Sequence, residues 1–150
     1  MQTSLLNKIV QSEAGTAALI LRVPVGLILA AHGAQKLFGL FGGNGLAGTA
    51  QWLSSMGMEP GLLMAVLAGG AEFFGGLALV LGILTRPAAL VAAFTMLIAI
   101  FSVHIGNGLF AADGGYEYAL VLMVALLALA VQGGGYLSID KVLSDKIGRI

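Results

Sequence analysis

The sequence predicts an all-helical integral membrane protein: a four-helix bundle running up-down-up-down, in a single domain over residues 1–150. Two observations favour this fold. Hydrophobic residues make up 59% of the chain and charged residues only 9%, against about 25% charged in an ordinary soluble domain. Four stretches are mostly apolar over about the length that a helix needs to cross a bilayer. A water-soluble enzyme and a disordered chain are both excluded by the same numbers.

The predicted spans cover residues 17–38, 61–84, 87–105 and 116–131. Pro24 falls in the first two turns of the first span, where a missing backbone N–H costs least. Pro87 opens the third span directly after a turn that is too short for anything but an antiparallel helical hairpin.

The connection between the first two spans also carries a helical pattern. Leu46, Ala50, Leu53 and Met56 recur at helical spacing, and Trp52 lies beside them. We therefore expect a short helix at the membrane interface, anchored by Trp52. It is either a plain surface helix or a lid over an outward-facing pocket.

Lysine and arginine are distributed unevenly about the predicted spans. Lys36 lies on one side, and the other side holds Lys8, Arg86, Lys141, Lys146 and Arg149. Because positive charge is enriched on the cytoplasmic side of membrane proteins, both termini are predicted to be cytoplasmic. Residues 138–143 are expected to form a short amphipathic helix on that surface.

One pattern occurs twice, at the outer ends of the first and third spans. It reads H-x-x-[QN]-x-L-F-x-x-x-G-G and begins at His32 and again at His104. The two spans run in the same direction, so the pattern indicates either a duplicated helical hairpin or a coincidence in a chain rich in glycine and leucine.

Ionisable groups within a bilayer are costly and usually functional. Glu72 is the strongest such signal, because it lies near the middle of its span and shares a helical face with Gly69 and Gly76. Arg22 is its expected partner, and the pair is read either as a structural contact or as a site that handles protons or a ligand. The full set of candidate ligand or proton-handling residues is Arg22, His32, Lys36, Glu72, His104 and Glu117.

His32 and Lys36 are four residues apart and so lie on one helical face. Together with His104 and Glu117 they would form an outer polar pocket beneath residues 46–56; alternatively, they are interfacial groups that never meet a ligand. No metal site is expected, and the chain has no cysteine. Zero net charge offers no basic face for nucleic acid.

Several segments together resemble the DoxX family of small bacterial membrane proteins, over about residues 17–145. They include the stretches at 32–38, 48–57, 72–76, 81–86 and 137–140. The resemblance implies a four-helix protein of the bacterial cytoplasmic (inner) membrane. It implies an association with membrane redox or stress complexes, and it does not by itself assign a reaction to this chain.

The leading hypothesis is a subunit that binds a quinone or anchors a membrane oxidoreductase partner. Trp52, Phe73 and Phe74 are candidate pocket walls, and the cofactor that this hypothesis implies is a quinone. The alternatives are a small oligomeric transporter or permease, or a structural interaction protein with no small-molecule site. The bilayer itself is a partner in every case, and a homo-oligomer is compatible with each.

The charge distribution generates a topology prediction. Cysteines introduced singly near residues 8 and 145 should resist an impermeant thiol reagent that is applied to intact cells. The chain has no native cysteine, so any labelling would report on the introduced residue. Labelling of both positions from outside would overturn the predicted topology.

Overall fold

The computed structural model describes residues 5–147, and within them every regular element is helical. Three helices are long and apolar enough to cross a membrane: α2 (Gly15–Phe38), α4 (Gly61–Leu81), and α5 with its continuation, over Thr85–Asn107. The fourth apolar helix, α6 (Glu117–Gln132), has 16 residues. These helices lie at the four predicted stretches, but only three reach spanning length, so the four-span bundle stays a prediction.

The remaining elements are short. They are α1 (Leu5–Val10), η1 (Leu40–Gly42), α3 (Gly45–Ser55), η2 (Ile100–His104), η3 (Ile105–Asn107), η4 (Ala111–Asp113) and α7 (Ile139–Ile147). Here α5 denotes Thr85–Ala99, which η2 continues as a π-helical turn. Helices occur in both places where the sequence predicts short ones, between the first two spans (α3) and in the tail (α7). Whether α3 lies at a membrane interface stays a prediction.

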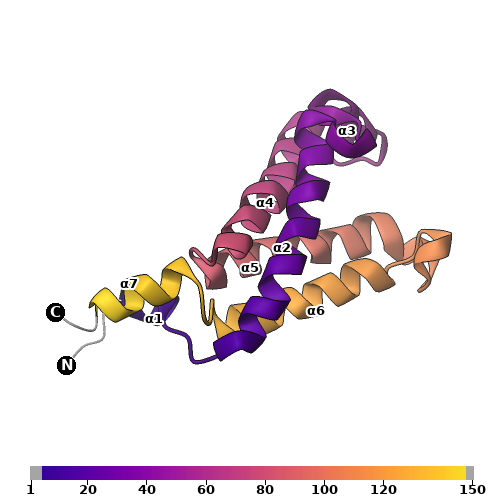
Figure 1. The fold of residues 1–150 in the computed structure, drawn as a ribbon. Helices are drawn as coiled ribbons and strands as arrows, with labels where there is room; N and C mark the ends of the chain where they lie inside the picture. The colour runs from indigo at the N-terminus through magenta and orange to yellow at the C-terminus, as the bar shows by residue number, and fades with distance from the viewer. Residues whose placement is uncertain (1–4, 148–150) are drawn as a thin grey trace.

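The long helices form two hairpins, α2 with α4 and α5 with α6 (Figure 1). The hairpins meet near α1 and α7, the first and last described helices, and diverge away from them. We call the meeting point the terminal end. The opposite end of the α2–α4 hairpin, which carries α3, is called the far end. The arrangement is therefore more open than the up-down-up-down four-helix bundle that the sequence predicts.

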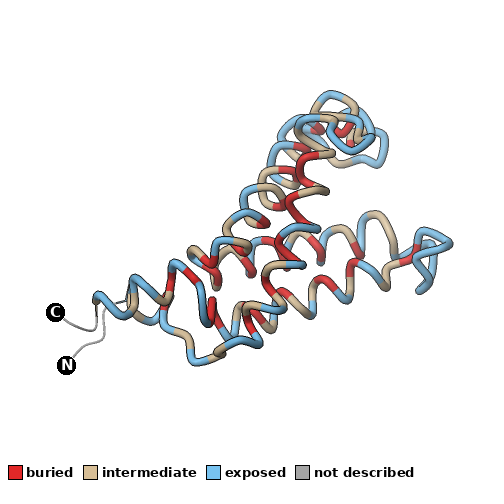
Figure 2. The backbone as a smooth tube through the Cα atoms, viewed as in Figure 1, coloured by how far each residue is buried: buried red, intermediate tan, exposed pale blue. Residues whose placement is uncertain are grey.

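Buried residues follow the helix contacts, and exposed residues cover the outward faces (Figure 2). The main core joins α2 to α5 and α6 through small and branched side chains. Its members include Ala18, Val25, Leu29, Ala89, Ala92, Ala93, Met96, Leu122, Leu126 and Leu129. Alanines on α5 let that helix approach its neighbours closely, as small residues do in membrane bundles.

Glycines set the separation of α2 and α4. A Cβ added at Gly26 would lie 2.6 Å from the Gly76 carbonyl oxygen, and one at Gly76 would lie 2.5 Å from the Ala30 amide nitrogen. A Cβ at Gly33 would collide with the backbone of Phe73. All of these neighbours are backbone atoms, which cannot rotate away, so the two helices are in direct main-chain contact.

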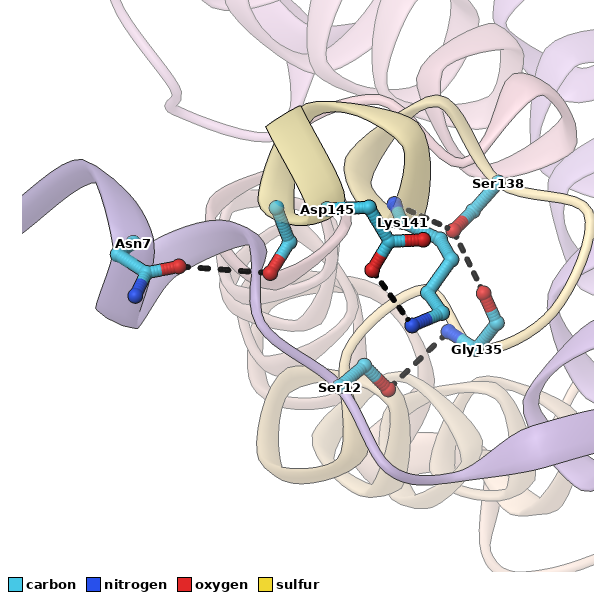
Figure 3. Close-up of polar contacts among 7 residues, drawn as sticks. Asn7, Ser12, Gly135, Ser138, Lys141 and Asp145 are labelled. Carbon is cyan, nitrogen blue, oxygen red and sulfur yellow. Dashed lines mark hydrogen bonds and ion pairs between the residues drawn. The ribbon is translucent and has the colours of Figure 1, made fainter. Parts of the chain in front are cut away.

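At the terminal end, polar side chains tie the N-terminal segment to the tail (Figure 3). Ser12 accepts a hydrogen bond from the Gly135 amide at 3.1 Å, and Ser138 donates to the Gly135 carbonyl at 2.7 Å. Lys141 and Asp145 form an ion pair on α7, and the bond to Asp145 raises the pKa of Lys141. The α6–α7 turn is thus fixed from both sides.

The glycine contacts predict which small substitutions the fold tolerates. Gly33→Ala and Gly76→Ala should each destabilise the protein by roughly 1–3 kcal/mol, because overpacking forces the two backbones apart. Gly70→Ala is the matched control, since a Cβ there meets nothing within 4 Å. Thermal unfolding in detergent is the measurement. Equal behaviour of all three variants would contradict the close contact.

Candidate functional site

Glu72 is buried between α2 and α4 and forms an ion pair with Lys36. The carboxylate side chain is 5% exposed, whereas the lysine side chain is 28% exposed. The register of the two helices explains the pairing. With Gly33 against Phe73, and Gly69 against Leu37 and Lys36, the Lys36 side chain lies at nearly the same level as Glu72.

Lys36 also lies on the wall of an open cleft of about 330 Å³ at the far end. The other lining residues are Gln35, Gly42, Gly43, Asn44, Thr49 and Trp52. Thr49 of α3 donates a hydrogen bond to the Lys36 carbonyl at 3.2 Å and so fixes α3 over the end of α2. The cleft therefore has an aromatic wall, neutral polar groups and the Lys36 ammonium, whose ion-pair partner Glu72 is buried.

Arg22 does not pair with Glu72, and here the expectation from the sequence is wrong. Its fully buried guanidinium donates to the carbonyls of Leu79 at 3.0 Å and Val80 at 2.5 Å, in the last turn of α4. It also donates to three carbonyls after α6, those of Gly134, Tyr136 and Leu137, at 2.7–3.2 Å. The last carbonyls of a helix lack intrahelical partners, and a cation there also suits the helix dipole.

Asp140 is a further buried polar residue that stabilises the terminal end, and its role was not predicted from the sequence. Its two carboxylate oxygens accept hydrogen bonds from the amides of Leu84 and Thr85, each at 2.8 Å. Those amides begin α5, directly after a turn in which Leu84 has a left-handed backbone with φ of 47°. The tail thereby holds the α4–α5 turn in a conformation that leucine rarely adopts. The one available signal was Asp140 itself, in the segment 137–140 that resembles the family.

The two histidines lie outside the cleft. The His32 ring lies 6.1 Å from that of Tyr118, at the start of α6. Nδ1 of His104 makes a 2.7 Å hydrogen bond with the Gly114 carbonyl, and Glu117 accepts one from the Ala111 amide at 2.6 Å. His104 and Glu117 thus stabilise the loop between α5 and α6. Only Lys36 and Trp52 of the predicted pocket residues line the far-end cleft.

The other two predicted walls, Phe73 and Phe74, pack edge to face with ring centroids 5.2 Å apart. Phe73 also packs edge-on against Phe38 at 5.1 Å. Neither phenylalanine lines the cleft, and Phe74 is 65% exposed. Within the described residues, their contacts therefore favour helix packing and the outer apolar surface over a ligand site.

The repeated pattern serves to close loops. In the first copy, the Gln35 amide donates to the Phe41 carbonyl at 3.2 Å. In the second copy, the Asn107 amide donates to the Gly114 carbonyl at 3.3 Å. Gly43 and Gly114, one from each glycine pair, pack close to that same amide residue. The amide side chain thus bonds within the following loop in both copies, although the acceptor residues differ in their place in the pattern, and duplication of the hairpin stays a prediction.

The model of the DoxX family matches residues 17–105, which is more than half of the chain. The chain therefore belongs to the DoxX family. It is 30% identical to "Putative oxidoreductase CatD" of Bacillus subtilis over 128 residues, covering 85% of this chain and 86% of that protein. It is 37% identical to "Inner membrane protein YqjF" of Escherichia coli over 105 residues, covering 69% and 78%.

An uncharacterized protein of Haemophilus influenzae is 36% identical over 77 residues, which span about half of each chain. No solved structure matches the chain. The family and the inner-membrane relative, with the three long apolar helices, identify a membrane protein.

The ion pair predicts a specific pattern of energetic coupling. Lys36→Met strands a buried carboxylate and should cost about 3–5 kcal/mol of stability. Glu72→Gln should cost less, because the freed ammonium can turn into the cleft. Combining the two should be milder than the sum of the singles.

Arg22→Gln combined with Glu72→Gln is the matched control, and its effects should add, because the two residues do not touch. A double-mutant cycle on thermal unfolding in detergent measures both couplings. Additivity for Lys36 and Glu72 would contradict the pair.

Proposed function

We propose that this protein is a membrane subunit of a redox complex that takes the head group of a quinone or quinol in its far-end cleft. The observation that carries the proposal is the Lys36–Glu72 pair, whose lysine lies on the wall of a cleft beside Trp52. The name of the Bacillus relative, "Putative oxidoreductase CatD", supports the redox context.

The residues of the cleft suit the chemistry of a quinone ring. Trp52 offers a flat apolar face, and the Lys36 ammonium offers hydrogen bonds to a carbonyl oxygen of the ring. Reduction of a quinone consumes two electrons and two protons. Lys36 would donate one proton at a ring oxygen, and water in the open cleft would supply the second proton and reprotonate Lys36, which restores its ion pair with Glu72. The electrons would come from an oxidoreductase partner.

The same contacts weaken the transporter alternative. A path through the membrane needs polar groups that face water or substrate, and Arg22 was a candidate for that role. Arg22 is fully buried, and its guanidinium is occupied by five carbonyls at the terminal end. Lys36, the ion-pair partner of Glu72, instead lines the cleft at the far end.

We also propose that the terminal end faces the cytoplasm and the far end the outside of the inner membrane. The support is the placement of basic residues, because Lys8, Arg86, Lys141 and Lys146 all lie on elements at the terminal end. In this orientation the cleft meets the quinone pool at the outer leaflet.

Trp52 is the only tryptophan of the chain, so its fluorescence reports on the cleft directly. A short-chain ubiquinone analogue should quench it saturably in detergent, and Lys36→Met should weaken the apparent affinity about tenfold, the loss expected for one charged hydrogen bond. Lys36→Arg keeps the charge and should retain binding.

His104→Gln is the control, because His104 lies outside the cleft. A linear, non-saturating quench that is equal in all variants would mean partition into the micelle and would refute the site.

A further inference from the structure

A second cleft lies at the terminal end, far from Lys36 and Glu72. It is open, has a volume of about 460 Å³, and lies where the segment before α2 meets the start of α5 and the end of α6. Its lining includes Lys8, Gln11, Glu13, Arg86, Val131 and Gln132. The proposed function uses none of these residues.

The two cations of this cleft differ in how they are held. Arg86 is fixed, since its guanidinium donates to the carbonyls of Ala130 at 2.9 Å, Gln11 at 3.1 Å and Val131. Lys8 is exposed, and among residues 5–147 its ammonium has no hydrogen-bond or ion-pair partner. The cleft thus presents one anchored and one free positive charge.

Glu13 is the single carboxylate on the same lining, and it too forms no ion pair within the described chain. Two cations face one carboxylate, so the cleft attracts an anion, and Glu13 opposes that attraction. Gln11 and Gln132 add neutral amide groups. Such a set suits a singly charged phosphodiester better than a doubly charged phosphate.

An apolar stripe leads away from the cleft along α6. Val131 lines the cleft and is 76% exposed, and Leu127 and Val124 continue the same helical face at 44% and 57% exposed. A ligand that binds its phosphate beside Lys8 and Arg86 could lay an acyl chain on this stripe. A free phosphate ion would leave the stripe unused.

We propose that this cleft binds the phosphodiester of an anionic phospholipid, with Lys8 and Arg86 at the head group and the Val124–Leu127–Val131 face under an acyl chain. A lipid bound here would anchor the terminal end to the bilayer surface. Arg86 makes this connection, because its guanidinium also donates hydrogen bonds to the last carbonyls of α6.

The test uses the full chain, purified and delipidated in neutral detergent, with native mass spectrometry of added phosphatidylglycerol or phosphatidylcholine. Phosphatidylglycerol should bind in preference. Lys8→Gln should weaken its binding about fivefold, the effect expected for one basic residue near a lipid head group. Glu13→Gln should strengthen binding by a similar factor, a change that loss of folding could not produce.

Lys146→Gln is the matched control, because Lys146 is an exposed lysine of α7 that does not line the cleft. It should leave the affinity unchanged. Equal weakening by Lys8→Gln and Lys146→Gln would show diffuse surface attraction and overturn the site, as would equal binding of the two lipids. Full displacement by inorganic phosphate or by chain-free glycerophosphoglycerol would assign the cleft to a soluble phosphate and overturn the lipid proposal.

Discussion

The fold depends on one guanidinium that satisfies the carbonyls of two separate segments. In an apolar surrounding, an unpaired backbone carbonyl costs free energy that water cannot recover. Arg22 meets two such carbonyls at the end of α4 and three in the turn after α6. Because that turn leads to Asp140, which binds the start of α5, a side chain on α2 and the tail together fix the junction of both hairpins.

Fixing the hairpins at one end leaves the other end free to diverge. The far end carries helix α3 and the open cleft, which is lined by the end of α2 and by the segment from η1 to α3. The glycine contacts hold α2 and α4 close enough for Lys36 to reach Glu72 across their interface. Stability and the candidate site thus occupy opposite ends of the same helix pair.

The positions of the helices could be predicted from the sequence, because apolar runs and prolines mark their ends locally. The partner of Arg22 could not be predicted, for two physical reasons. Pairing by opposite charge ignores backbone carbonyls, which every residue carries and no sequence pattern displays. The register of α2 against α4 also depends on how α3 folds back, and that register brings Lys36 rather than Arg22 level with Glu72.

The two hairpins make similar side-chain hydrogen bonds at both of their ends, and the repeated pattern covers only one of those ends. In each, an arginine on the first helix binds last-turn carbonyls of the second, Arg22 for α4 and Arg86 for α6. In each, an amide side chain closes the loop at the opposite end, from Gln35 or Asn107. One difference concerns the candidate site: where the first copy has Lys36, the second has Gly108. A buried charge pair needs both partners, so the second hairpin has no counterpart of the Lys36–Glu72 pair at this position.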